Sequence, residues 1–160
     1  MPRVKVTICS EILARQGLTI AFIESATAGR MCSEFALTEN SGDILRGGLA
    51  SYDASVKEEI LKIPHDLIAE YTPESAEVTK AMAISGGNLF KADVTVAVTG
   101  LTTPGGSETA EKPVGTIFLH IITPSGEVHH REVFSAEPEE IILRAIDRAA
   151  SLVTNNLTRT

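Results

Sequence analysis

The turn Glu24–Gly29 carries the first residues whose types and spacing could do chemistry. An apolar run, 18–23, ends abruptly in this turn, and a segment with helical spacing follows it. The pattern predicts a strand, a tight turn and a helix start, which places a hydroxyl beside the backbone N–H groups of the helix. Ser25 could then attack an acyl carbon while those N–H groups receive the developing oxyanion. The alternative is that Ser25 and Thr27 only cap the helix.

A phenol, Tyr52, ends the second predicted strand, 44–52, and a lysine follows it. Asp53 is placed to cap the next helix, and Lys57 lies one turn further on. A lysine can activate a serine without histidine if burial lowers its pKa enough to leave the amine neutral. Tyr52 would lie beside the pair. The alternatives are an exposed helix lysine and a half-buried strand tyrosine.

A third polar loop, 99–106, is rich in Gly, Thr and Pro. Glycines there free several backbone N–H groups, an arrangement suited to cradling an anion. Because ligand sites of open α/β sheets collect beyond the ends of the strands, we expect the three loops to meet. An ordinary connection is the alternative, since a glycine-rich loop alone is weak support for a site.

Helices and strands that alternate and then end in a hairpin must position these loops. The order indicates an α/β fold, with a mixed sheet and helices on both faces. We find no repeat and no long linker, so residues 1–160 are predicted to form one domain. The first expected helix is amphipathic, runs through Val4, Ile8, Ile12 and Leu13, and ends at Gly17. The other expected helices are 30–37, one from 54, 64–71, one from 73 through 89, and one from 138. The expected strands are 18–23, 44–52, 93–98, 114–122 and 128–134, and 38–43 is expected to be a loop.

Composition excludes several classes of function. The net charge of −7 argues against nucleic acid as the main partner, because phosphate neutralisation needs clustered Lys and Arg. No segment is apolar enough for a membrane span, and the N-terminus lacks a signal-peptide pattern. Cys9 and Cys32 are predicted to be small apolar side chains in a reducing cytoplasm, and the spacing of the histidines predicts no metal site.

The three segments together resemble one family, the C-terminal domain of the competence/damage-inducible CinA proteins, which also occurs alone as a nicotinamide mononucleotide (NMN) amidase. The resemblance runs over nearly the whole chain. The family pattern AESCTGG stands here as IESATAG at 23–29, and GGVxYSNEAK stands as GGLASYDASVK at 47–57. VTGIAGPGG stands as VTGLTTPGG at 98–106, and EEKPVGTV stands as AEKPVGTI at 110–117.

This resemblance implies a single α/β/α sandwich that hydrolyses the carboxamide of NMN to nicotinate mononucleotide and ammonia, without a metal or cofactor. Ser25 would be the nucleophile, Lys57 the general base and Tyr52 a residue that orients or assists the lysine. Backbone N–H groups of the 25–29 turn would form the oxyanion hole. The predicted substrate-binding residues are Glu24, Thr27, Gly29, Gly47, Gly48, Thr99, Gly100, Gly105 and Gly106, with a structural role in the turn as the alternative for Glu24.

The chain departs from the family pattern at positions that bear on the substrate. Ala28 adds a methyl group where the family has glycine. Asp53 puts a carboxylate near Lys57, where it would favour the protonated amine. The family's F-x-G-D-R and the arginines after it are replaced by 134–142, with only Arg144 nearby and an acidic run at 137–140. Loss of guanidinium–phosphate pairs would weaken recognition of a mononucleotide.

Two further readings therefore stay open beside the amidase. The chain could be a weakly active or inactive homologue that keeps the pocket and binds a nucleotide-like small molecule. It could also be an assembly domain, although that reading leaves the polar loops unexplained. The relatives suggest a homo-oligomer without setting the number of subunits.

Overall fold

One mixed sheet, in the order β2-β1-β3-β4-β5, forms the centre of the computed structural model, which describes residues 1–159. The pairs β2–β1 and β1–β3 are parallel, while β3–β4 and β4–β5 are antiparallel. The predicted mixed sheet is confirmed, and the parallel strands end at one shared edge. The strands are β1 (Ile20–Glu24), β2 (Leu45–Ala50), β3 (Val94–Gly100), β4 (Thr116–Thr123) and β5 (Gly126–Val133).

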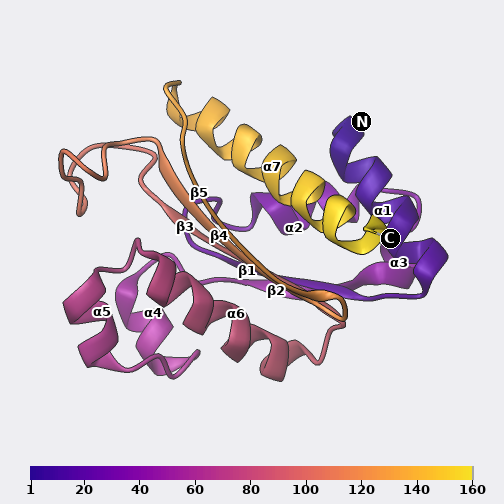
Figure 1. Ribbon diagram of the computed structural model, residues 1–160, viewed down its shortest axis with the longest axis horizontal. Coiled ribbons are helices and arrows are strands. Elements are labelled where there is room, and N and C mark those ends of the chain that lie inside the picture. The colour runs from indigo at the N-terminus through magenta and orange to yellow at the C-terminus, as the bar shows by residue number, and fades with distance from the viewer. Residues whose placement is uncertain (160) are drawn as a thin grey trace.

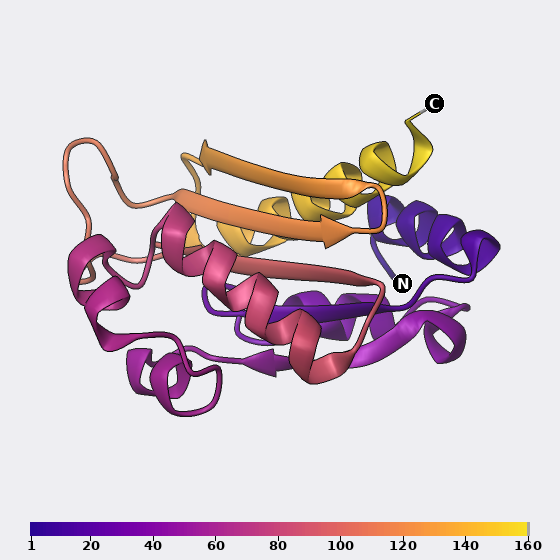
Figure 2. The ribbon, with the colours of Figure 1, turned by 60° about the horizontal axis from the view of Figure 1, so that its bottom comes forward.

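Helices cover both faces of this sheet, as predicted (Figure 1). One layer holds α1 (Val4–Gln16), α2 (Arg30–Ala36) and α7 (Pro138–Thr158). The opposite layer holds α4 (Ala54–Glu59), α5 (His65–Tyr71) and α6 (Ala76–Phe90), with α6 running along the sheet in both views (Figure 2).

Alternate side chains of β1 pack in two separate hydrophobic cores, one on each face of the sheet. Phe22 packs in the core under α1, α2 and α7, where its ring centroid lies 4.7 Å from that of Phe35. Ile23 points to the other face and packs with Met82 of α6 and Ala97 of β3. This alternation is the period-2 geometry of a strand covered on both sides.

The opening helix buries two of the four side chains predicted to face inward, Ile12 and Leu13. The other two, Val4 and Ile8, are 74% and 44% exposed, whereas Val6 and Cys9 are fully buried in their place. Both sets have helical spacing, so periodicity alone could not separate them. The expected end of the helix is confirmed, because Gly17 has φ of +66° and closes α1 with N–H bonds to Leu13 and Ala14 carbonyls.

Two local features were mispredicted. The polar segment expected as a loop contains one short helix, α3 (Ser41–Ile44). Helix α6 begins at Ala76 and not at 73, because the hydroxyl of Ser75, rather than that of Thr72, accepts the capping hydrogen bond from the Val78 N–H.

A glycine in α6 permits the close approach of this helix to β1. A β-carbon at Gly86 would lie 2.2 Å from Cγ1 of Ile23, so Gly86→Ala must push the helix or the strand apart. We expect a loss of about 1–3 kcal/mol in the free energy of unfolding, measured by urea denaturation. Gly87→Ala is the matched control, because its β-carbon would come no closer than 3.3 Å to the Thr95 hydroxyl. Equal stability of the two variants would contradict this account of the packing.

Candidate active site

The ends of β1 and β2 bring a serine and a lysine into contact. Ser25 follows the last residue of β1, and Lys57 lies on α4, which begins after the end of β2. The Lys57 Nζ lies 3.0 Å from the Ser25 Oγ. Ser25 is buried and the Lys57 side chain is 0% exposed. The alternative of a solvated lysine is therefore wrong, and the pair has the geometry of a nucleophile and its base.

Two carbonyl oxygens fix the direction of the lysine amine. Nζ donates to the Ser51 carbonyl at 2.5 Å and lies 3.4 Å from the Tyr52 carbonyl. Burial lowers the pKa of Lys57 below its ordinary value, and this effect outweighs the opposing charges of Glu74 and Asp53. When the amine is neutral, its two N–H groups can remain on these carbonyls while its lone pair faces the Ser25 hydroxyl.

The carboxylate of Glu24 holds the turn that presents Ser25. Its Oε1 accepts from the Thr27 hydroxyl at 2.5 Å and from the Met31 N–H at 2.7 Å, and its Oε2 accepts from the Cys32 N–H at 3.0 Å. Glu24 and Thr27 are each 1% exposed. Both side chains therefore serve the turn and the start of α2 and do not line the cavity described below. This differs from the substrate contact expected from the sequence.

Neutralising this buried carboxylate should destabilise the protein. Glu24→Gln leaves one acceptor oxygen for the three donors, which are the Thr27 hydroxyl and the Met31 and Cys32 N–H groups. The new amide N–H₂ group is itself a donor and cannot accept from the donors left over. We expect a loss of about 2–3 kcal/mol in the free energy of unfolding, measured by urea denaturation. Glu11→Gln, on the exposed side of α1, is the control and should change it by less than about 0.5 kcal/mol. A Glu24→Gln protein as stable as this control would rule out the proposed role.

Not every N–H of the predicted oxyanion turn is free. The Ser25 N–H donates to the Val98 carbonyl at 2.9 Å, and the Ala28 N–H donates to the Ser25 carbonyl at 3.1 Å. Within residues 1–159, no hydrogen bond occupies the N–H groups of Ala26, Thr27 or Gly29. Ala26 also lines the cavity beside Ser25. Its N–H is therefore the strongest candidate among the donors of this turn.

Tyr52 and Asp53 occupy places that differ from their expected roles. Tyr52 reaches Lys57 through its main-chain carbonyl, while its side chain lines the cavity and is 66% exposed. The alternative of a half-buried strand tyrosine is therefore also wrong. The Asp53 carboxylate caps α4 by accepting from the N–H and hydroxyl of Ser55, at 2.8 and 2.6 Å. Those bonds lower the pKa of Asp53, and the carboxylate makes no ion pair with Lys57 in the described part of the chain.

A cavity of about 250 Å³ opens at Ser25. One wall is the 100–106 segment, and the other walls come from the Ser25 turn, Tyr52 and the segment before α6. Glu74 is the one charged side chain in the lining, and it is absent from the site residues predicted from the sequence. The lining residues are Ser25, Ala26, Tyr52, Glu74, Gly100, Leu101, Thr102, Thr103, Pro104, Gly105 and Gly106.

The predicted anion cradle is occupied by the protein's own carboxylate. The N–H groups of Gly105 and Gly106 donate to the two oxygens of Glu108 at 2.7 and 2.8 Å. The Gly105 bond is the largest cause that lowers the pKa of Glu108, so this carboxylate is ionised at neutral pH. The glycine N–H groups therefore bind an anion, as expected, but that anion is the Glu108 side chain and not a ligand.

Besides Glu24 and Thr27, four more of the predicted substrate-binding residues lie away from the cavity lining. Thr99 is fully buried, and its hydroxyl lies 2.9 Å from that of Thr79. Gly47 and Gly48 lie in the edge strand β2, where added β-carbons would approach Phe90 and the Phe22 carbonyl, respectively. Gly29 is the N-cap of α2 and has φ of +92°. These glycines are explained by packing or backbone conformation rather than by a ligand.

A lysine that sequence analysis left without a role fixes the loop that forms one wall. Lys112 Nζ donates to the Thr72 hydroxyl at 2.6 Å, the Glu74 carbonyl at 2.9 Å and the Ser107 hydroxyl at 2.9 Å. These bonds tie the 101–115 loop to the segment between α5 and α6. Both ribbon views show this loop at the end of the molecule where α5 lies (Figures 1 and 2).

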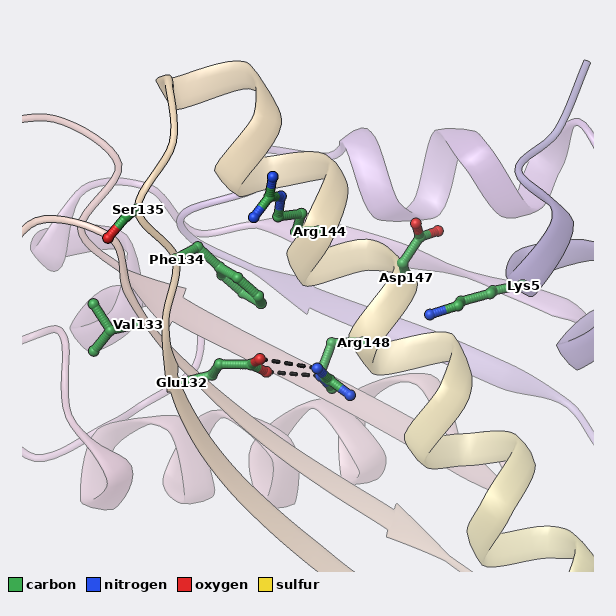
Figure 3. A pocket seen from close by; sticks show the side chains of 8 residues that line it. All are labelled: Lys5, Glu132, Val133, Phe134, Ser135, Arg144, Asp147 and Arg148. Carbon is green, nitrogen blue, oxygen red and sulfur yellow. Dashed lines mark hydrogen bonds and ion pairs between the residues drawn. The ribbon is translucent and has the colours of Figure 1, made fainter.

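A second cavity, of about 510 Å³, lies between α7, α1 and the end of β5 (Figure 3). Its charged groups largely neutralise one another. Arg148 donates to both oxygens of Glu132, at 2.7 and 2.8 Å, and Asp147 pairs with Arg3 at 2.6 Å. No serine–lysine contact occurs there among the described residues, so the smaller cavity at Ser25 is the candidate active site.

The family model for the CinA C-terminal domain matches residues 4–157. The chain belongs to the CinA C-terminal domain family. A CinA-like protein of Desulfotalea psychrophila is 37% identical over 134 residues, which cover 84% of this chain and 32% of that protein. A CinA-like protein of Prochlorococcus marinus is 32% identical over 143 residues, covering 86% of this chain and 34% of that protein. The chain therefore spans about a third of the length of these relatives.

Solved structures of CinA superfamily proteins share this fold. A competence-damaged protein (CinA) superfamily protein of Klebsiella pneumoniae superposes with a TM-score of 0.90 at 20% identity, covering 96% of this chain and 95% of that one. Another, of Enterobacter cloacae, gives 0.89 at 25% identity, covering 99% and 95%. The resemblance seen in the sequence motifs is thus confirmed for family and fold.

Residues 1–159 contain neither a bilayer-spanning helix nor a cluster of metal-binding side chains. No helix there has the length and apolar character needed to cross a bilayer. No group of three or more His, Cys, Asp or Glu side chains there is arranged to hold a metal ion.

Proposed function

We propose that this chain is an amidohydrolase that cleaves a primary carboxamide through a Ser25–Lys57 pair. The observation that supports this proposal is the distance of 3.0 Å between Lys57 Nζ and Ser25 Oγ. The Lys57 side chain is fully buried, and Ser25 lines a cavity. A structural lysine would gain nothing from desolvation beside a hydroxyl, since burial of an ammonium without a carboxylate partner costs free energy.

Acylation uses groups that are already in contact. Ser25 Oγ attacks the amide carbon while its proton passes to the neutral Lys57 Nζ. The carbonyl oxygen becomes an oxyanion, which the Ala26 N–H stabilises by hydrogen bonding. Lys57 then returns the proton to the amide nitrogen, the C–N bond breaks, and ammonia leaves an ester on Ser25.

Deacylation repeats these steps with water. Lys57 takes a proton from a water molecule that attacks the ester carbon, and the oxyanion forms again at the Ala26 N–H. The C–O bond to Ser25 then breaks, and Lys57 returns the proton to Oγ. The product is a carboxylic acid, and the enzyme is restored without a metal or a cofactor.

A pyridine carboxamide is the substrate class that the family resemblance favours, with NMN as the reference compound. The test is ammonia release from NMN and from related pyridine carboxamides by the purified protein in the presence of EDTA, with the matching carboxylate product identified by chromatography. Equal amounts of ammonia and carboxylate are expected. Absence of ammonia release from every compound in this class would overturn the proposal.

One observation favours a binding protein as the second candidate. The Ser51 and Tyr52 carbonyls, which accept from Lys57, stabilise an ammonium more than a neutral amine. A lysine held protonated at neutral pH could not accept the serine proton, so the cavity would bind an amide without cleaving it. Saturable binding of a pyridine carboxamide, with no carboxylate product up to pH 9.5–10, would identify this function. The range extends to this pH because an amine of ordinary pKa, about 10.4, already begins to lose its proton there.

A further inference from the structure

Charge in the cavity bears on which carboxamide fits it. Glu74 is the one charged side chain in the lining and forms no ion pair with any described residue. Its Oε2 accepts a hydrogen bond of 2.5 Å from the Ser107 hydroxyl, which fixes the carboxylate. Lys112 Nζ donates to the same hydroxyl at 2.9 Å from outside the cavity lining, so its charge partly offsets that of Glu74 without a direct ion pair. A carboxylate held in this way attracts a cation and repels an anion that enters the same cavity.

The donors that would hold a phosphate are already in use. Both oxygens of Glu108 accept from the Gly105 and Gly106 N–H groups, so a phosphate must displace an ionised carboxylate that belongs to the same loop. Lys112 cannot replace them, because its three N–H donors are directed to Thr72, Glu74 and Ser107. No Arg or Lys is among the lining residues.

We infer that the carboxamide ligand of this cavity is a cation without a phosphate group, held through its positive charge by Glu74. The inference rests on the function proposed above and narrows its substrate class. It assigns specificity to two carboxylates: Glu74 selects for positive charge on the ligand, and Glu108 selects against a phosphate by occupying the glycine N–H groups.

Two pyridinium carboxamides that differ only in a phosphate provide the test. Nicotinamide riboside carries the pyridinium charge alone, whereas NMN adds a phosphate dianion. We expect kcat/KM for ammonia release to be at least about tenfold higher for the riboside. Calorimetric binding to Ser25→Ala, which retains the cavity but lacks the nucleophile, should show the same preference in Kd.

Two charge variants separate the roles of the carboxylates. Glu74→Gln retains an acceptor for Ser107 and should weaken riboside binding by about tenfold, while Glu77→Gln, in the exposed first turn of α6 just after Glu74, should leave it unchanged. Glu108→Ala should strengthen NMN binding several-fold by freeing the glycine N–H groups, while Glu111→Ala in the same loop should have no effect.

The outcomes distinguish this inference from the amidase proposal. If NMN is hydrolysed as well as the riboside or better, the amidase stands and the charge selection is overturned. If neither compound is hydrolysed but Ser25→Ala binds the riboside at least tenfold more tightly than NMN, the selection stands and the amidase fails for these substrates. Absence of binding of both compounds, by wild type and by Ser25→Ala, would overturn the inference.

Discussion

Ser25→Ala should abolish carboxamide hydrolysis, with a loss of at least about 10³-fold in kcat. The hydroxyl oxygen is the one protein atom that bonds to the substrate carbon in the proposed reaction, so no neighbouring group can replace it. Substrate binding should change little, because the substitution removes a single oxygen from the cavity wall. Ammonia release under saturating substrate gives kcat, and calorimetry on the same variant gives Kd.

Ser33→Ala is the matched control for this variant. Ser33 lies on the exposed side of α2, the helix that follows the Ser25 turn, and should retain full activity. Undiminished ammonia release by Ser25→Ala would remove the serine mechanism even if the protein proved to be an amidase.

Lys57→Met should also suppress hydrolysis, by about 10²–10⁴-fold, because the serine loses its general base. The wild-type pH profile should carry the signature of the same residue. Burial lowers the pKa of Lys57 below its ordinary value of 10.5, so kcat/KM should rise with pH through this lowered pKa and level off below 10.5. In Lys57→Met, the residual activity should lack that rise.

The lowered pKa of Lys57 also predicts how stability depends on pH. Between the folded and unfolded pKa values, the unfolded chain binds more protons at Lys57, so the free energy of unfolding should increase with pH up to about 10.5. Burial raises the pKa of the Cys9 thiol to about 12, which acts in the opposite direction above pH 9. Because both proteins contain Cys9, the difference between wild type and Lys57→Met isolates the lysine.

Urea unfolding at pH 7, 8, 9 and 10 measures this difference. Wild type should gain stability relative to Lys57→Met across the series. Lys80→Met, which removes an exposed lysine from α6, should follow the wild-type pH dependence. A Lys57→Met curve parallel to wild type over the whole range would show that the buried lysine keeps an ordinary pKa.

Sequence patterns determined the local elements that carry the site. The apolar run before Glu24 predicted a strand ending at a polar turn, and Asp53 predicted a helix cap, because both signals depend on residues adjacent in the chain. The hairpin of β4 and β5 was predictable for the same reason, since a short turn links strands that pair with each other. Motif order pointed to the CinA C-terminal domain family.

Tertiary structure decided which polar groups are available to a ligand. Glu24 and Thr27 carry side chains suited to binding, but the fold uses both to hold the turn. Glu74 was not among the predicted site residues, and only the approach of the 101–115 loop makes it the charged wall of the cavity. The contact between Glu74 and Ser107 joins residues 33 positions apart, and no local pattern encodes it.

The burial of Lys57 shows most clearly what the sequence determined and what the tertiary structure decided. Its residue type and its place one turn after Asp53 were readable from the sequence, and the family motif suggested a base. Whether the amine is solvated or buried depends on how α4 packs against the ends of β1 and β2. The sequence thus determined which groups the site contains, whereas the packing determined their burial and therefore the pKa on which the proposed chemistry depends.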